Sequence, residues 1–246
     1  MEPIYSQKFQ ITDIHVDCFG RVKPSVLLYF AQEIAGRHCN LLALDWDTLS
    51  KRHLFWAVTR HRVQITRLPT RGETITVETW PMPTTRVAYP RSVVAYDEGG
   101  NEVFRAITLW VLMDSETRAM VLPGKSGVLV EGTLRGNELA SPRSIVPTVL
   151  QNTDTRTVRY TQLDRNGHMN NTRYLDWIND LLPSAFHEGH PVREFTICYL
   201  SEAKEGQQLH LSWELSDGPV LNVDAHREKT NVPGEKERVF SAHVVF

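Results

Sequence analysis

The sequence has few cysteines, little net charge and no long apolar run, and each shortage excludes a class of protein. Three cysteines, an odd number without paired spacing, argue against a disulfide framework and against a zinc site. Because 27 basic residues nearly balance 29 acidic ones, no overall field attracts the chain to nucleic acid or to an anionic membrane. No apolar run is long enough to span a bilayer, and the first residues lack the pattern of a secretory signal. We therefore expect a cytoplasmic protein that does not insert into membranes.

Several common functional motifs are missing as well. The sequence contains neither the glycine motifs of nucleotide-binding proteins nor the Gly-x-Ser-x-Gly motif of serine hydrolases. His187 and His190 are three residues apart, but they follow Pro183 in an expected Gly-containing loop and have no third ligand. Solvated loop histidines explain this pair better than a metal site. We therefore expect neither a metal nor a cofactor.

What the sequence does contain is an internal repeat. The segments Asp17–Pro24 and Asp164–Asn171 share an Asp-x-x-Gly pattern, and their offset is 164 − 17 = 147 residues. The apolar residues after the first segment have the i, i+1, i+4, i+7, i+8 spacing of a one-sided helix, and the same stripe recurs 147 residues later. Two helices in matching register are therefore expected, with the stripes Leu27, Leu28, Ala31, Ile34, Ala35 and Tyr174, Leu175, Ile178, Leu181, Leu182.

Both predicted helices have recognisable ends. Pro24 or the serine after it is expected to begin the first helix, and Gly36 to follow its last turn. Asn170 or Asn171 is expected to cap the second helix, and Pro183 to end it. Each repeat thus consists of a tight turn and a mostly buried helix, followed by strand-like sequence.

Short segments rich in Val, Ile, Thr and aromatic residues follow each helix, and turn clusters such as Asp97–Asn101 divide them. Consecutive short strands build an antiparallel sheet, and a single long helix per half can be buried only if that sheet wraps around it. The sequence therefore predicts an α+β class and a tandem hot-dog fold. The alternative is an ordinary α+β domain in which the repeat is coincidence. The predicted strands are 56–66, 73–80, 87–96, 103–114, 192–200, 207–215, 220–227 and 238–246.

The same pattern predicts two domains. Residues 1–130 are expected to form an N-terminal hot-dog domain, and residues 148–246 a C-terminal one. Residues 131–147 carry Gly, Ser, Pro and charge with weak periodicity, so the linker is expected there.

Reactive side chains distinguish the second half from the first. Asn166 and His168 stand where the first turn has an aromatic residue and an arginine. Aligning Gly72 with Gly206, an offset of 134, places Glu202 opposite a leucine. If duplicated halves do different jobs, residues that break the symmetry in this way are candidates for function, and all of them lie in the second half.

The candidate residues have a spacing that suits one shared site. Asp164, Asn166 and His168 alternate along the chain, so their side chains are expected on one side of an extended segment. The helix N-terminus that follows could stabilise an oxyanion through its unpaired amides. Asp164 has a counterpart, Asp17, in the half without histidine, so we expect it to orient its neighbours. Taken singly, a histidine is usually structural, and asparagine is a favoured turn or cap residue.

With these residues identified, the chain resembles the acyl-acyl carrier protein (acyl-ACP) thioesterases of plants and bacteria. Leu163–Trp177 is similar to the family signature Asp-x-Asn-x-His-x-Asn-Asn-x-x-Tyr-x-x-Trp. Phe55–Arg60, Leu68–Glu73 and Trp110–Arg118 also resemble family blocks, so the resemblance covers nearly the whole chain. It implies hydrolysis of the thioester of fatty acyl-ACP, which releases free fatty acid and terminates fatty acid synthesis.

The resemblance also implies the catalytic residues and the partner. The family uses Asp, Asn and His from this turn and a Glu from the next strand, which correspond to Asp164, Asn166, His168 and Glu202. Many plant members have Cys after that Glu, whereas this chain has Ala203, so a carboxylate route is expected in place of a cysteine nucleophile. The implied partner is acyl carrier protein with its phosphopantetheine-linked acyl chain.

Substrate binding is expected to involve both halves. The first half is expected to form an apolar groove for the acyl chain around Trp56, and Asn170, Asn171 and Tyr174 are further candidates for substrate contacts. The competing hypotheses are a hot-dog acyl-CoA thioesterase, a hot-dog dehydratase and a non-catalytic acyl-binding protein. A homodimer is one of the assemblies that the sequence leaves open.

Overall fold

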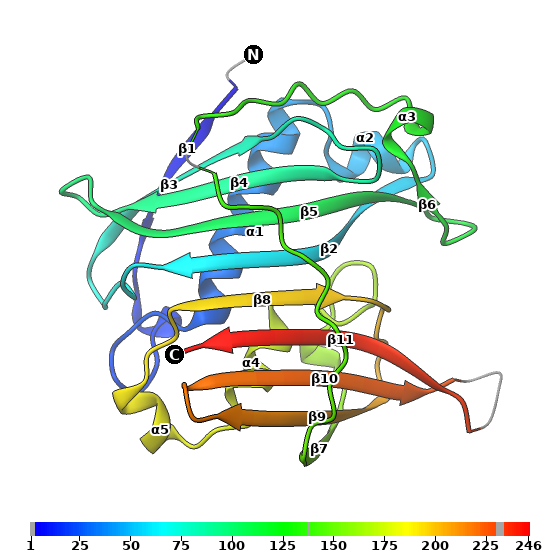
Figure 1. The fold of residues 1–246 in the computed structure, drawn as a ribbon. Coiled ribbons are helices and arrows are strands. Elements are labelled where there is room, and N and C mark those ends of the chain that lie inside the picture. Colours follow the sequence, from blue (N-terminus) through cyan, green and yellow to red (C-terminus); the bar gives the residue numbers. More distant parts are fainter. Residues whose placement is uncertain (1–2, 137, 230–233) are drawn as a thin grey trace. The chain divides into compact units, whose positions relative to one another are not determined.

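A computed structural model describes residues 3–136, 138–229 and 234–246, and the chain divides into two compact units after Pro142 (Figure 1). Asn137, within the expected linker, and the first two residues lie outside the described ranges. In the described part of the chain, no helix is both long and apolar enough to cross a membrane.

The first unit is an antiparallel sheet with a long helix on one face. Helix α1 (Pro24–Leu41) contacts β1 and β3 (Figure 1). The strand order is β1-β3-β4-β5-β2, with β6 paired to β5. The remaining elements are β1 (Tyr5–Gln10), η1 (Asp13–His15), α2 (Trp46–Ser50), β2 (Leu54–Ile65), β3 (Thr74–Pro81), β4 (Tyr89–Tyr96), β5 (Glu102–Asp114), β6 (Met120–Val121) and α3 (Pro123–Ser126).

Helix α1 begins where the sequence predicted and ends later. Pro24 takes the first helical position, where its missing N–H is not needed. All five residues of the predicted stripe are buried, so this prediction is confirmed. The prediction that Gly36 follows the last turn is wrong, because the helix continues to Leu41. An exposed glycine inside a helix costs about 1 kcal/mol, and the burial of Ile34, Ala35 and His38 around it offsets this.

The second unit repeats the arrangement with a shorter helix. Its antiparallel sheet has the order β8-β11-β10-β9-β7. Tyr174 on α4 packs edge-on against Phe240 of β11, so α4 covers one face of this sheet. The elements are β7 (Asn152–Thr157), η2 (Tyr160–Gln162), α4 (Arg173–Asn179), α5 (Ser184–Gly189), β8 (Glu194–Tyr199), β9 (Gln208–Ser216), β10 (Val220–Glu228) and β11 (Lys236–Val245).

Pro183 explains why the second helix is short. With the offset of 147, Pro183 corresponds to Gly36, so α4 and α5 together replace what is one continuous helix in the first unit. A proline ring clashes with the carbonyl four residues earlier, which here belongs to Asn179, the last residue of α4. That carbonyl accepts a hydrogen bond from the Leu182 amide at 3.2 Å. The helix therefore ends four residues before the proline.

The histidine pair after Pro183 does not lie in a loop, so that expectation is wrong. His187 lies on α5, and His190 is the residue that caps its C-terminal end. The His187 ring makes a 2.9 Å hydrogen bond to the Asn179 carbonyl, and the His190 ring makes one of the same length to the Phe186 carbonyl. Both rings thus stabilise the segment that Pro183 interrupts.

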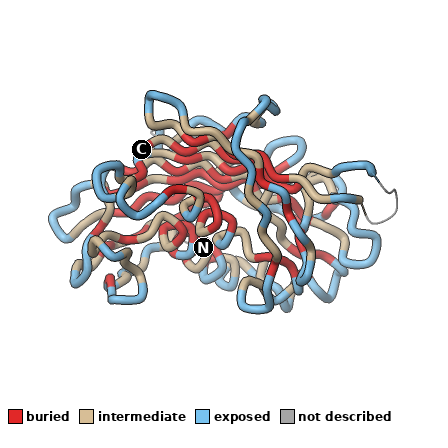
Figure 2. The backbone as a smooth tube through the Cα atoms, turned by 90° about the horizontal axis from the view of Figure 1, so that it is seen from below, coloured by how far each residue is buried: buried red, intermediate tan, exposed pale blue. Residues whose placement is uncertain are grey.

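The eight predicted strands are all present, and their ends agree with the structure within two residues. Strands β1, β6 and β7 were not named from the sequence. Buried residues gather on the strands and on the sheet-facing sides of the helices, while the connecting turns are exposed (Figure 2). Each unit therefore has its own core of buried strand residues, and the α+β class with its repeat is confirmed.

Candidate active site

The two Asp-x-x-Gly turns have the same backbone geometry. In the first unit, Asp17 Oδ1 accepts hydrogen bonds from the amides two and four residues later, at 2.9 and 3.0 Å. In the second unit, Asp164 Oδ1 accepts the equivalent bonds from Asn166 and His168, at 2.8 and 3.2 Å. The glycines of both turns have positive φ, 76° and 75°, which glycine adopts without strain. Asp164 therefore shapes the turn, as Asp17 does in the half without the reactive residues.

The segments that face the two turns also correspond, with the offset of 134 that the glycine alignment suggested. The residue after each turn donates its amide to a carbonyl of the facing segment. The Val22 amide donates to the Pro69 carbonyl and the Met169 amide to the Ala203 carbonyl, each at 2.8 Å. Isolated bridges pair residue 21 with residue 70 and His168 with Lys204. Glu202 thus takes the position of the first unit's leucine at 68, as predicted.

The consequence is a close pair of reactive side chains. The His168 Nε2 atom lies 3.3 Å from the Glu202 Oε2 atom. The side chain of His168 is 10% exposed and that of Glu202 is 39% exposed. An imidazole that is nearly buried beside a carboxylate that solvent can reach is an arrangement suited to activating water.

Asn166 lies on the same turn, half-buried, with its side chain directed toward Asp164. Its Nδ2 atom donates to Asp164 Oδ2 at 3.4 Å, a long hydrogen bond. An amide held only at this distance can still donate to a substrate carbonyl. The structure therefore brings together Asp164, Asn166, His168 and Glu202, the four residues that the sequence selected.

Two amides at the N-terminus of α4, where oxyanion donors were expected, already have hydrogen-bond partners. Asn170 Oδ1 accepts the Thr172 amide at 2.9 Å, and the Asn170 carbonyl accepts the Arg173 amide at 2.9 Å. These two amides at the start of α4 are therefore already satisfied. Asn170 acts as the turn residue before the helix, two residues ahead of the N-cap Thr172, and this role accounts for its contacts without a substrate.

Tyr174, another proposed substrate contact, is a buried aromatic residue, and Asn171 is joined to its neighbour Tyr199 through its backbone carbonyl. Tyr174 is 3% exposed and packs against Tyr199, whose hydroxyl donates to the Asn171 carbonyl at 2.8 Å. Burial raises the pKa of the Tyr174 phenol well above its usual range; Arg227 opposes this shift, and the carboxylates of Asp164 and Glu202 add to it. Tyr174 is thus protonated at neutral pH, and it cannot serve as a base.

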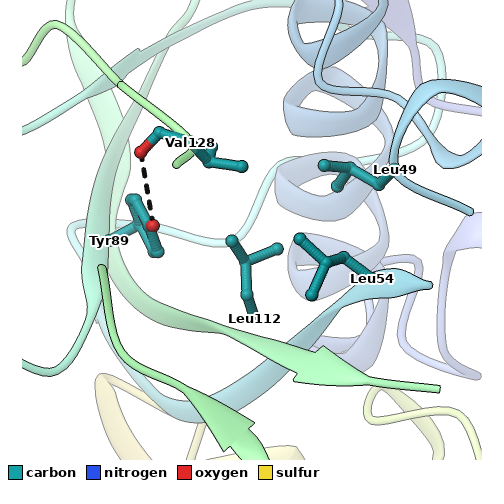
Figure 3. Close-up of a cluster of buried hydrophobic side chains, with 5 residues drawn as sticks. All are labelled: Leu49, Leu54, Tyr89, Leu112 and Val128. Atoms are coloured by element: carbon teal, nitrogen blue, oxygen red, sulfur yellow. Dashed lines mark hydrogen bonds between the residues drawn. The ribbon is translucent and has the colours of Figure 1, made fainter. Parts of the chain in front are cut away.

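Trp56 lies in the first unit, beside a cluster of buried side chains. The cluster comprises Leu49, Leu54, Tyr89, Leu112 and Val128 (Figure 3). The Trp56 ring meets the Tyr89 ring edge-on at 5.0 Å, and its indole nitrogen donates to the Leu44 carbonyl at 2.9 Å. Trp56 is therefore a fixed, partly buried side chain at the margin of an apolar cluster.

A cysteine nucleophile is not available next to Glu202. Ala203 follows Glu202 and is fully buried. Cys198 is buried on β8, where its sulfur contacts the Arg143 carbonyl at 3.7 Å. The candidate site therefore depends on the carboxylate and the imidazole.

The shared geometry of the two turns leads to a paired prediction. Asp17→Ala and Asp164→Ala each remove two hydrogen bonds from amides to a carboxylate, and each is expected to lower the free energy of unfolding by about 2 kcal/mol. Only Asp164→Ala is expected to lower kcat as well, because only its turn carries His168. Urea unfolding and steady-state kinetics of both variants check this, and a loss of kcat in Asp17→Ala beyond its loss of folded protein would contradict it.

The repeated sheet-and-helix unit, with reactive side chains in one copy, defines the chain as a tandem hot-dog protein. The chain belongs to the acyl-ACP thioesterase family. The family model for the acyl-ACP thioesterase N-terminal domain matches residues 2–122, and the model for the C-terminal domain matches residues 148–238.

Individual relatives agree with this assignment. A palmitoyl-acyl carrier protein thioesterase from Gossypium hirsutum is 26% identical over 235 residues, which are 89% of this chain and 57% of that protein. A dodecanoyl-[acyl-carrier-protein] hydrolase from Cinnamomum camphora is 28% identical over 230 residues, 87% of this chain and 60% of that protein. The chain thus spans less than two thirds of the length of these relatives.

Solved structures show the same fold. An acyl-ACP thioesterase from Bacteroides thetaiotaomicron superposes with a TM-score of 0.85 and 25% identity, covering 99% of this chain and 98% of that one. The 12:0-ACP thioesterase from Umbellularia californica superposes with a TM-score of 0.83 and 23% identity, covering 100% of this chain and 97% of that one. The tandem hot-dog fold predicted from the sequence is therefore confirmed.

Proposed function

We propose that this chain hydrolyses the thioester bond of a fatty acyl group carried on acyl carrier protein, releasing the free fatty acid and terminating fatty acid synthesis. The observation that supports this most directly is the His168–Glu202 pair, 3.3 Å apart, in the half that carries the family signature. The first half has a leucine and an arginine at the corresponding positions. The relatives named as acyl-ACP hydrolases support the same substrate class.

The proposed mechanism uses the pair in one of two ways. In the first, His168 and Glu202 remove a proton from a water molecule, whose oxygen then bonds to the acyl carbon. In the second, Glu202 attacks the acyl carbon directly and water hydrolyses the resulting anhydride. In both, the Asn166 amide donates to the carbonyl oxygen, the carbon–sulfur bond breaks, and the phosphopantetheine sulfur leaves as a thiol after it receives a proton.

Labelled water distinguishes the two routes. A single turnover in water enriched in ¹⁸O places the label in the fatty acid if water attacks the acyl carbon. If Glu202 attacks first and water then attacks the side-chain carboxyl carbon of Glu202 in the anhydride, the label appears in the peptide that contains Glu202. Label in that peptide, found by mass spectrometry, identifies the carboxylate as a nucleophile. Label in the fatty acid alone is expected if the carboxylate is a base, or if water opens the anhydride at the acyl carbon.

The two domains are proposed to have different roles in the reaction. The C-terminal domain, residues 148–246, carries the catalytic residues, and the N-terminal domain, residues 1–130, binds the acyl chain, with residues 131–147 as the linker. The apolar cluster beside Trp56 supports this, because a fatty chain gains about 0.8 kcal/mol per buried CH₂ group. The kcat/KM values for a series of acyl chains of different length and saturation, all on the same carrier, measure how much of this burial energy contributes to the reaction.

The carrier preference is a testable prediction. The kcat/KM for acyl-ACP is expected to exceed that for the matched acyl-CoA by at least about tenfold, equivalent to about 1.4 kcal/mol of additional binding energy in the transition state. A thiol-reactive dye measures the thiol released from both carriers. Equal or faster hydrolysis of acyl-CoA would favour the acyl-CoA thioesterase. Elimination of water from a 3-hydroxyacyl group without thiol release would indicate a dehydratase, and tight acyl binding without turnover would indicate a binding protein.

The proposed location of the protein is the cytoplasm. Cys18, Cys39 and Cys198 are free thiols, which suits the reducing cytoplasm. A homodimer stays a prediction, and light scattering of the purified chain tests it.

A further inference from the structure

Glu202 lies on the segment that connects two strands of the sheet. Strand β8 ends at Tyr199 and β9 begins at Gln208, so residues 200–207 lie outside these two strands. At the start of this segment, the Val239 carbonyl accepts the amides of Leu200 and Ser201 at 2.8 and 3.1 Å. Because a backbone carbonyl outside a strand needs another donor, the partner of the Glu202 carbonyl helps to determine where this residue lies.

Arg227 of β10 supplies that donor. Its Nη1 atom donates to the Glu202 carbonyl and, at 2.7 Å, to Gln207 Oε1. Its Nε and Nη2 atoms donate to one oxygen of Glu237, at 3.0 and 2.9 Å. Arg227 therefore connects the Glu202 backbone to Gln207, at the end of the same loop, and to Glu237 on β11.

The same network reaches both sides of Glu202. The Ser201 hydroxyl donates to the other oxygen of Glu237 at 2.5 Å, and the Lys204 amide donates to Gln207 Oε1 at 2.9 Å. Hydrogen bonds from Ser201 and Arg227 lower the pKa of the Glu237 carboxyl, although its partial burial opposes this. Glu237 is thus ionised at neutral pH and keeps the guanidinium in place.

The first unit has an equivalent of the loop that carries Glu202, but without a candidate catalytic residue. Each unit has a β-bulge that leaves one valine without a partner across the strand pair. After the bulge, Tyr96 of β4 pairs with Glu102 of β5 in the first unit, and His226 of β10 pairs with Arg238 of β11 in the second. The offset here is 226 − 96 = 130, which places Arg227 at the position of Asp97. In the first unit the arginine is on the loop itself, where Arg67 bonds the carboxylates of Glu73 and Asp97. The second unit therefore has its arginine on the strand, directed at the carbonyl of the candidate catalytic residue.

We propose that Arg227 is a positioning residue for Glu202: by binding the Glu202 carbonyl it places the Glu202 carboxylate beside His168. This inference rests on the proposed function of the His168–Glu202 pair. It adds a residue that touches neither the acyl group nor the reacting atoms and that acts only through the geometry of the loop.

The test compares two arginines that hold equivalent loops. Arg227→Met is expected to lower kcat about tenfold with little change in KM, because a small displacement of a catalytic group is costly. Arg227→Lys is expected to recover part of the loss, since an ammonium group can still donate to the carbonyl. Arg67→Met is the matched control, which removes the corresponding network of the first unit and should lower the melting temperature without lowering kcat.

A second readout does not depend on turnover. The NMR signals of the His168 ring report whether the Glu202 carboxylate lies beside it, and in Arg227→Met they are expected to move toward those of Glu202→Gln. Unchanged ring signals together with wild-type kcat in Arg227→Met would overturn the proposal, as would equal losses of kcat in Arg227→Met and Arg67→Met. If the wild-type chain hydrolyses neither acyl-ACP nor acyl-CoA, the proposed function fails, while the ring signals still decide whether Arg227 positions Glu202.

Discussion

Glu202→Gln and His168→Ala are each expected to lower kcat about 10²- to 10⁴-fold, the usual contribution of a general acid–base group. Glutamine keeps the shape of the Glu202 side chain but cannot take a proton or attack a carbonyl. The Glu202 side chain is 39% exposed, so its contact with His168 contributes little to stability, and Glu202→Gln should unfold close to the wild-type temperature. Steady-state kinetics on acyl-ACP and thermal unfolding measure the two effects separately.

The controls for this pair come from the same loop. Glu205 is an exposed carboxylate three residues after Glu202, and Glu205→Gln is expected to leave kcat unchanged. The double variant of His168 and Glu202 should lose about as much activity as the worse single variant, because residues that act as one unit are not additive. If both single variants turn over near the wild-type rate, these residues are not the active site.

Asn166→Ala is expected to lower kcat about 10²- to 10³-fold, the typical effect of removing one oxyanion donor. With the Thr172 and Arg173 amides already bonded to Asn170, the Asn166 side chain is the strongest remaining candidate for the donor to the thioester carbonyl. The side chain contributes only a 3.4 Å hydrogen bond to the turn, so the folded state should lose little stability.

Asn166→Asp separates donation from packing. Aspartate has nearly the same shape as asparagine but offers no N–H and adds a negative charge where negative charge develops, so its kcat should fall at least as far as that of Asn166→Ala. Activity close to wild type in Asn166→Asp would show that the amide does not donate to the carbonyl. A change in KM alone would assign Asn166 to substrate binding.

Much of the fold could be predicted because its signals are local. The spacing of Leu27, Leu28 and Ala31 follows the helical period. The strands are indicated by β-branched and aromatic residues between turns. The match between the two halves added long-range information, because a second copy of each pattern fixed the register. It placed Glu202 opposite a leucine 134 residues earlier, and the paired bridges bear out that alignment.

The misses come from interactions that no local pattern contains. Gly36 is a common signal for the end of a helix, but buried neighbours on either side keep α1 intact. Pro183 ended its helix four residues ahead of the ring, and α5 then follows where a loop was expected. Asn170 uses both its side chain and its carbonyl on the Thr172 and Arg173 amides, so two of the amides expected as oxyanion donors already have partners.

The sequence by itself determined the repeat, the class of fold, the four candidate residues and the family, because these depend on residue type and on spacing along the chain. Only the tertiary structure decided that the His168 imidazole and the Glu202 carboxylate lie 3.3 Å apart, and that Arg227 binds the Glu202 carbonyl from a strand 25 residues further on. The physical reason is the range of the forces. A hydrogen bond acts over about 3 Å, and only the packing of strands on a common core brings groups so distant in sequence within that range.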